Sequence, residues 1–298
     1  MLEQVSDERI GHMADFKIGV IVDSFKLGLM DGIKKAEEIG ADGIQMYAAY
    51  GDTSPSLMTG VKRRELKNHV YDHGMVFSAM LGELGGHGLS IPRQQAERIE
   101  LLKRVMDMGM DLGTNIVTTH IGVVPEDSTH ERYKILQEAC HQLSEYGHKM
   151  GGYFAIETGP ERTKVLGDFL RSFGSKAMCV NYDPANLVMV TGDDPVLGID
   201  HVSEFIVHTH AKDGIRLHDN DPEYVYACFA EGDIDAINGL DGFQEVPLGQ
   251  GDVNFVAYLK ALKRIGYNGF LTIERECGDR PAEDIRIAVN FLKDIMKA

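Results

Sequence analysis

The chain has 298 residues, 43% hydrophobic and 26% charged, a composition typical of globular proteins. Its formal net charge of −16 argues against nucleic acid binding, which depends on Lys and Arg side chains that neutralise phosphates. No apolar run reaches the roughly 18 residues that span a bilayer. The polar, acidic start also lacks the apolar stretch of a secretory signal. We therefore expect a cytoplasmic protein that binds neither nucleic acid nor membranes.

Short apolar runs alternate with longer amphipathic segments along the chain. The runs are rich in β-branched and aromatic residues, as in strands that are buried on both faces of a parallel sheet. Strands that alternate with helices in this way predict an α/β fold, a (β/α)8 TIM barrel forming a single domain over residues 1–298. A doubly wound sheet is the alternative, but no GxGxxG follows the first run. The predicted strands are 16–22, 42–47, 76–81, 115–120, 153–157, 177–183, 204–210 and 269–274, and clear helical patterns cover 29–40, 96–113, 130–151 and 281–296.

The stretch 213–252 is polar, rich in glycine and without an obvious period. A loop of this length inside a compact domain usually has a function, so we predict a lid over the site or an interface with a partner subunit or a second copy. It ends in VPLGQGD (246–252), whose backbone N–H groups could cradle a phosphate. We favour the alternative, in which Asp252 caps a helix that begins near Val253. The cysteines form no CxxC pair and are expected to be free thiols.

Polar side chains stand at the ends of four successive predicted strands. Glu157 ends the fifth, Asp183 the sixth, His210 the seventh and Glu274 the eighth. In a barrel these carboxyl-terminal strand ends meet at one rim, where active sites lie. Three carboxylates without a cation would repel one another, whereas three carboxylates and one imidazole suit Mn²⁺, Mg²⁺, Co²⁺ or Zn²⁺. The sequence therefore predicts one divalent metal ion at this rim.

The segments around these positions resemble a known family. They are similar to the xylose isomerase-like superfamily and, within it, to the bacterial sugar phosphate isomerase/epimerase group that includes the ketose 3-epimerases. The resemblance covers most of the chain but is specific only in its second half, since the first 110 residues match only in their strand and helix rhythm. The segments are AIETGP (155–160), NYDPAN (181–186), VHTHAKD (207–213), VPLGQGDVNF (246–255) and GYNGFLTIERE (266–276).

The resemblance implies the same ligand set, with Mn²⁺ as the preferred ion. In the family's HxH motif the second histidine is the ligand, which selects His210 and places His208 one layer deeper in the barrel. Glu157 and Glu274 are implied to act as acid and base while also binding the metal, moving a proton through a metal-bound enediolate. One departure concerns the DxxH motif of the ketose 3-epimerases, because Asn186 stands here in place of histidine. An amide can bind a hydroxyl but takes up no proton at neutral pH, which puts specificity for free ketoses in doubt.

Further polar residues near the predicted rim are candidates for substrate binding. For His120, a purely structural hydrogen bond is as good an explanation as substrate binding. For Lys212, the alternative to substrate binding is an ion pair with Asp213 that orients the site. For Arg275 and Glu276, which follow Glu274, we expect salt bridges at the rim. The candidates for substrate binding are Glu83, His87, His120, Asn186 and Lys212.

These patterns predict a metal-dependent epimerase or isomerase of a sugar or keto-sugar, a small-molecule carbohydrate. The same site could instead serve a lyase or dehydratase acting on a keto-sugar, keto-inositol or oxidised C-glycoside, because a β leaving group can depart once the enediolate forms. A zinc phosphodiesterase is disfavoured by the acidic charge and by the absence of histidine at position 186. A non-catalytic binding subunit is disfavoured by the intact ligand set.

Overall fold

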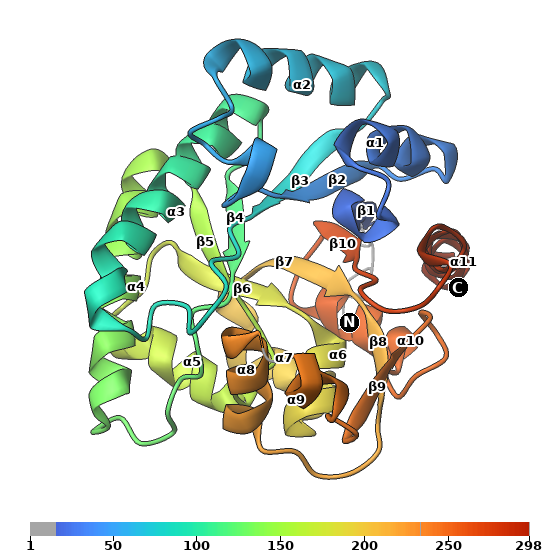
Figure 1. The fold of residues 1–298 in the computed structure, drawn as a ribbon. Helices are drawn as coiled ribbons and strands as arrows, with labels where there is room; N and C mark the ends of the chain where they lie inside the picture. Colours follow the sequence, from blue (N-terminus) through green and yellow to red (C-terminus); the bar gives the residue numbers. More distant parts are fainter. Residues whose placement is uncertain (1–15, 233, 298) are drawn as a thin grey trace, which may run out of the picture.

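Eight parallel strands close into a barrel in the computed structural model, which describes residues 16–232 and 234–297 (Figure 1). Their order around the barrel is β1-β10-β7-β6-β5-β4-β3-β2, so strands that follow one another in the barrel sequence are neighbours in space. The prediction of a (β/α)8 barrel is confirmed, and each of the eight predicted runs overlaps a barrel strand. The strands are β1 (Lys17–Ile21), β2 (Gly43–Tyr47), β3 (Val76–Leu81), β4 (Ile116–Thr119), β5 (Tyr153–Glu157), β6 (Met178–Tyr182), β7 (Ile206–Ala211) and β10 (Phe270–Ile273).

Helices surround the barrel. The helix expected to begin at residue 96 begins instead at Pro92, because proline fits the first turn, where no backbone N–H is needed. Gly113 and Gly151 end α3 and α4 in the left-handed conformation that favours glycine. No described helix is both long enough and apolar enough to cross a membrane. The helices are α1 (Leu29–Glu38), α2 (Gly60–Asp72), α3 (Pro92–Leu112), α4 (Glu131–Met150), α5 (Thr163–Ser172), α6 (Pro184–Asn186), α7 (Gly198–Val202), α8 (Pro222–Glu231), α9 (Ile234–Asn238), α10 (Phe255–Arg264) and α11 (Pro281–Met296), with the short turns η1 (Val22–Phe25), η2 (Gly51–Thr53), η3 (Leu187–Thr191) and η4 (Ser203–Phe205).

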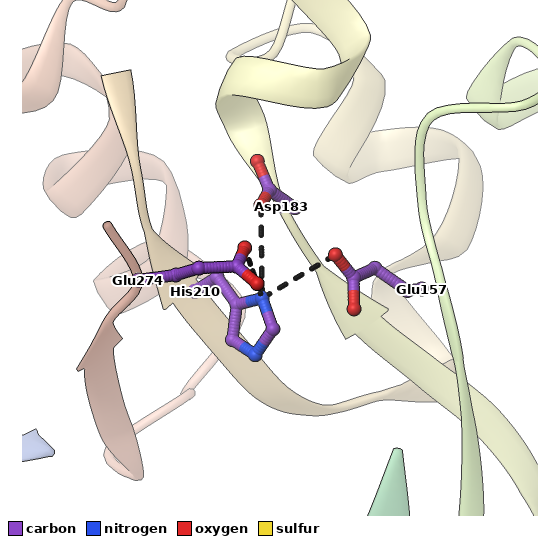
Figure 2. A group of neighbouring side chains, drawn as sticks. All are labelled: Glu157, Asp183, His210 and Glu274. Carbon is purple, nitrogen blue, oxygen red and sulfur yellow. Dashed lines mark ion pairs between the residues drawn. The ribbon is translucent and has the colours of Figure 1, made fainter. Parts of the chain in front are cut away.

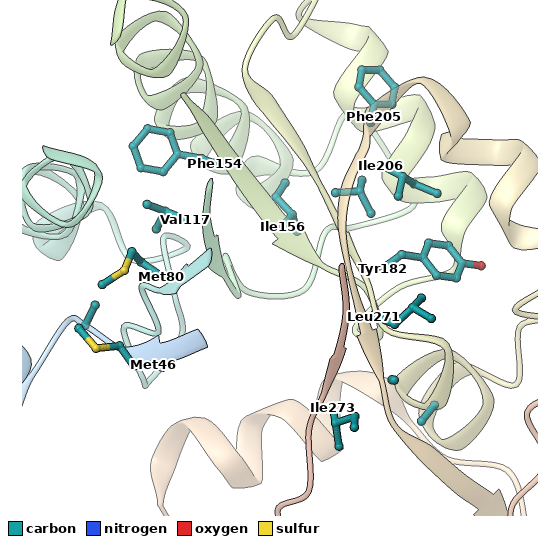
Figure 3. Close-up of a cluster of buried hydrophobic side chains, with 14 of the residues drawn as sticks. Met46, Met80, Val117, Phe154, Ile156, Tyr182, Phe205, Ile206, Leu271 and Ile273 are labelled. Atoms are coloured by element: carbon teal, nitrogen blue, oxygen red, sulfur yellow. The ribbon is translucent and has the colours of Figure 1, made fainter. Parts of the chain in front are cut away.

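The two faces of the barrel strands differ in chemistry. Apolar side chains such as Phe154, Ile156 and Leu271 are buried in the hydrophobic core that the strands share with the helices (Figure 3). Alternate residues on the strands point into the barrel, where several polar side chains are hydrogen-bonded to one another. There the His208 ring contacts Asn181 Oδ1 at 2.9 Å and Thr272 Oγ1 at 3.1 Å. This polar layer lies beneath the rim and holds its side chains in place.

The stretch 213–252 is folded, which corrects the expectation of an irregular loop. β8 (Asp213–Arg216) and β9 (Phe243–Val246) pair antiparallel, and α8 and α9 lie between them (orange in Figure 1). Glu223 at the start of α8 forms an ion pair with Arg132 on α4. We call residues 213–252 the excursion. It reaches from the end of β7 across the rim to α4, the helix that follows β4.

Candidate metal centre

Four side chains from four neighbouring strands converge at the carboxyl-terminal rim (Figure 2). Glu157 ends β5, Asp183 follows β6, His210 lies in β7 and Glu274 follows β10. One potential ligand atom from each lies within 4.8 Å of the others, and all four side chains are buried. The rim positions predicted for these four residues thus bring them together.

His210 is the centre of this cluster. Its Nδ1 atom lies 3.5 Å from Glu157 Oε1, 3.6 Å from Asp183 Oδ2 and 3.3 Å from Glu274 Oε2 (Figure 2). On the other side of the ring, Nε2 lies 3.1 Å from Gln45 Oε1, and Gln45 Nε2 donates to Thr118 Oγ1. Because Gln45 thereby presents its carbonyl oxygen, it favours a hydrogen on Nε2, which also lies 3.2 Å from the Asn181 amide nitrogen, while Nδ1 faces the three carboxylates.

The donor set fits a divalent cation. Asp183 Oδ2 and Glu274 Oε2 are buried, face His210 Nδ1 and have no hydrogen-bond partner among the described residues, although Glu274 Oε2 also forms an ion pair with Lys212. Burial opposes a charge on His210, yet the Glu157 and Glu274 carboxylates raise the pKa of its ring well above the usual value. A proton is therefore drawn to the place where a cation would bind. Three carboxylate oxygens and one imidazole nitrogen suit Mn²⁺, Mg²⁺, Co²⁺ or Zn²⁺, and these residues could hold such an ion.

Asp183 is oriented by the start of the next helix. Its Oδ1 atom accepts hydrogen bonds from the backbone N–H groups of Ala185 (2.8 Å) and Asn186 (2.9 Å), which caps α6. Its own N–H donates to Thr158 Oγ1. With Oδ1 engaged in the cap, Oδ2 is left to face the cluster.

The two glutamates are held as carboxylates by different neighbours. Glu157 accepts hydrogen bonds from the side-chain amides of Asn186 (3.1 Å) and Asn181 (3.2 Å). Burial favours its neutral form, but the imidazoles of His210 and His120 lower the pKa of Glu157 below the usual value. Burial likewise acts against the charge of Glu274, and Lys212 together with His210 lowers its pKa.

Lys212 forms two ion pairs at the rim. Its Nζ atom lies 3.1 Å from Glu274 Oε2 and 2.6 Å from Glu276 Oε2. The expected pair with Asp213 is wrong, because the Asp213 carboxylate accepts backbone N–H groups instead. The expected rim salt bridges are present, with Glu276 bound to Lys212 and Arg275 bound to Glu245 and Asp284.

Glu83 and His120 form a pair beside the cluster. His120 Nδ1 lies 2.9 Å from Glu83 Oε2, and His120 Nε2 lies 3.9 Å from Glu157 Oε1. Burial favours a neutral ring, but Glu157 and Glu83 raise the pKa of His120 to about 10. His87, by contrast, is exposed in the loop after β3, and its carbonyl oxygen accepts from Ser90. The structure thus brings all the predicted substrate candidates except His87 into contact with the cluster or its direct partners.

The VPLGQGD loop is filled by a side chain of the protein itself. Asp213 accepts hydrogen bonds from the backbone N–H groups of Gly249, Gly251 and Val253, the groups that a phosphate would need. The predicted helix cap is also wrong. Asn254 caps α10, whereas Asp252 accepts from the N–H of Arg216 and so joins the loop to β8.

Comparison with known proteins places the fold in a family. The profile of the xylose isomerase-like TIM barrel family matches residues 33–295. The chain belongs to this family. Two curated relatives align with part of the chain. The uncharacterized protein MJ1311 of Methanocaldococcus jannaschii is 24% identical over 67% of this chain, and the rhizopine catabolism protein MocC of Rhizobium meliloti is 28% identical over 51% of it. The alignments span 61% and 44% of those relatives' own lengths.

Several solved structures share the xylose isomerase-like barrel. A xylose isomerase domain protein from Planctomyces limnophilus is 25% identical, with a TM-score of 0.78 over 96% of this chain and 98% of its own. The probable 3-DHS dehydratase AsbF from Bacillus anthracis is 20% identical, with a TM-score of 0.69 over 95% and 98%. A D-tagatose 3-epimerase-like protein is 18% identical, with a TM-score of 0.70 over 95% and 99%. At the identities of the last two, the likeness is one of fold alone.

Sequence reasoning missed two side chains that orient the cluster of this xylose isomerase-like barrel. Gln45 contacts His210 Nε2 through its side-chain oxygen, and Asn181 donates to Glu157. Strand alternation could have found both, because Asn181 lies two residues before Asp183 on the same face and Gln45 lies on the inward face of β2. His208 is buried one layer deeper, as the strand pattern predicts, and burial lowers its pKa well below the usual value.

Proposed function

We propose that this xylose isomerase-like barrel is a divalent-metal-dependent epimerase or isomerase of a sugar or keto-sugar, with Mn²⁺ as its preferred ion. The observation that supports this most is the orientation of His210. Its Nδ1 atom faces three carboxylates, and one of them, Asp183, presents a buried oxygen that has no hydrogen-bond partner among the described residues. A fold shared with a D-tagatose 3-epimerase-like protein agrees with this proposal.

Two carboxylates approach the proposed centre from different sides of the barrel. Glu157 is on β5 and Glu274 follows β10, with β6 and β7 between them in the barrel order. A divalent ion bound at the centre would polarise the substrate carbonyl and so acidify the neighbouring C–H bond. One glutamate then removes the proton from one face of the substrate, and the other returns a proton to the opposite face.

Neighbouring groups prepare these glutamates for their roles. Asn181 and Asn186 fix the Glu157 carboxylate through hydrogen bonds, so its oxygens need not reorganise during proton transfer. Lys212 lies 3.1 Å from Glu274 and keeps it ionised, ready to accept a proton.

Elimination is the second candidate reaction, and His120 favours it. Glu83 fixes the His120 ring so that Nε2 lies 3.9 Å from Glu157 Oε1, next to the proposed base. In that position His120 could donate a proton to a departing hydroxyl after Glu157 has removed the neighbouring proton. The same residues would then make a lyase or dehydratase.

The test combines metal analysis with proton exchange. We expect one divalent ion per chain by elemental analysis and its loss in His210→Ala. We also expect the enzyme to exchange a carbon-bound hydrogen with D₂O in one member of a panel of ketoses, keto-glycosides and keto-inositols. Glu157→Gln and Glu274→Gln should lose at least about 10²-fold in rate, the scale of general acid–base catalysis, while exposed Glu145→Gln keeps its activity.

Three outcomes distinguish an epimerase, a lyase and a non-catalytic binding protein. Loss of a hydroxyl with exchange would favour the lyase, and inversion without loss would favour the epimerase. Failure to bind any divalent ion after reconstitution would reject the metal mechanism and favour a non-catalytic binding protein.

A further inference from the structure

Helix α8 lies over one side of the rim. Its first turn is tied to α4 by the Arg132–Glu223 ion pair. Near its other end, the Ala230 carbonyl oxygen lies 3.9 Å from the position that a Cβ on Gly86 would occupy, in the loop after β3. The helix therefore lies between the loop that follows β3 and the start of α4, although it belongs to the excursion after β7.

Tyr226 points from α8 toward the proposed site. Its ring centroid lies 5.7 Å from that of His120. A Cβ on Gly159, two residues beyond Glu157, would lie 2.6 Å from the Tyr226 hydroxyl oxygen. Gly159 has a φ of +140°, so the backbone here adopts a conformation that favours glycine and leaves room for the phenol. The Tyr226 hydroxyl thus lies against the end of β5.

The hydroxyl of Tyr226 has no hydrogen-bond partner among the residues that the structure describes. Burial and the nearby Glu157 carboxylate raise the pKa of Tyr226 well above the usual value, so the phenol keeps its proton. Of the charged donors nearby, Arg132 pairs with Glu223 and His120 Nδ1 pairs with Glu83, while His120 Nε2 is buried without a hydrogen-bond partner among the described residues. Beside this imidazole, Tyr226 presents a neutral hydroxyl donor.

We propose that Tyr226 is a substrate-binding residue, which donates a hydrogen bond to a hydroxyl or carbonyl oxygen of the sugar on the side of the site formed by His120 and the end of β5. This inference rests on the proposed function and adds a residue from outside the eight β/α units. It also gives the excursion a role, because α8 would cover the bound sugar and select substrates by the position of one oxygen.

The experiment compares Tyr226→Phe with wild type and with Tyr224→Phe. Tyr224 is a matched control, because it is on the same helix and 57% exposed. We would measure the Kd of D-fructose and D-tagatose by calorimetry with Mn²⁺-loaded protein, and the Kd of Mn²⁺ itself. Loss of one neutral hydrogen bond should weaken sugar binding about 10-fold in Tyr226→Phe and leave the Mn²⁺ affinity of both variants unchanged. In the exchange assay KM should rise while kcat stays within about threefold of wild type.

The outcomes separate this inference from the proposed function. Equal sugar affinity in Tyr226→Phe and wild type, with exchange activity intact, would overturn the role of Tyr226 and leave the enzyme assignment standing. A loss of Mn²⁺ affinity or of thermal stability in Tyr226→Phe would also overturn it, because Tyr226 would then be structural. If wild type neither binds nor exchanges any sugar, the proposed function fails and the Tyr226 inference fails with it.

Discussion

Glu161 is a buried carboxyl outside the four-residue cluster. It follows β5, its Oε2 atom accepts the N–H of Val124, and its Oε1 atom is buried without a partner among the described residues. Burial raises the pKa of Glu161 to about 8, and the hydrogen bond from Val124 only partly opposes this shift. The folded protein therefore holds a proton on Glu161 that the unfolded chain releases near its ordinary pKa of 4.5.

This proton links stability to pH. Because the folded-state pKa is the higher one, the stabilising contribution is complete below about pH 4.5 and is lost as the pH rises to about 8. Between these limits the Glu161 contribution should fall by about 1.4 kcal/mol per pH unit. Glu161→Gln resembles the protonated form, so its stability should exceed that of wild type at pH 8 and match it near pH 5. Urea unfolding at both pH values measures the difference, with exposed Glu145→Gln as control, and an equal pH slope in Glu161→Gln would contradict the assignment.

At the scale of elements, Asp213 joins the start of β8 to the loop before α10. Its buried carboxylate accepts four backbone N–H groups, which come from Gly214, Gly249, Gly251 and Val253. These bonds replace the regular hydrogen bonds that this loop lacks. They hold the excursion against the barrel.

Removal of this carboxylate should destabilise the fold. Asp213→Ala leaves several buried N–H groups without an acceptor, and we expect a loss of about 3 kcal/mol in the free energy of unfolding. Asp213→Asn keeps one acceptor oxygen and should lose about half as much. Chemical denaturation measures both, and wild-type stability in Asp213→Ala would show that water replaces the carboxylate without cost.

The excursion also shows what the sequence could not predict. The barrel strands were predictable because each is a local apolar run, and the four rim residues followed from the strand ends and the resemblance. β8 and β9 pair with each other across α8 and α9, and Glu245 on β9 binds Arg275 beyond β10. Such pairings join residues that are distant in sequence, and the local periodicity of apolar residues does not predict them. Strand alternation places Gln45 on the inward face of β2, but its contact with His210, 165 residues away, could not be predicted from a local pattern.

At the scale of the whole molecule, ion binding should stabilise the fold. A ligand that binds only the folded state adds about 2.7 kcal/mol at 100 times its Kd, which corresponds to about 4 °C in Tm for a chain of this length. Because the net charge of −16 attracts cations without specificity, the measurement belongs in about 0.15 M salt.

Asp183→Asn is the sharpest variant for this test. The amide oxygen of Asn can still cap α6, so the metal-free Tm should stay within about 2 °C of wild type, while the rise in Tm with Mn²⁺ should disappear. Calorimetric scans with Mn²⁺ and with a chelator measure both effects. An undiminished rise in Asp183→Asn would mean that the ion binds elsewhere.

The double use of the Asp183 carboxylate constrains how this position can change over generations. One oxygen caps a helix and the other faces the cluster, so a substitution of Asp183 affects the stability of the fold as well as metal binding. Glutamate would displace both oxygens by a methylene, and serine or threonine would keep only the cap. Relatives that no longer bind the ion should therefore still have a small polar residue that caps the helix at this position. Such a residue would mark where the metal site had been.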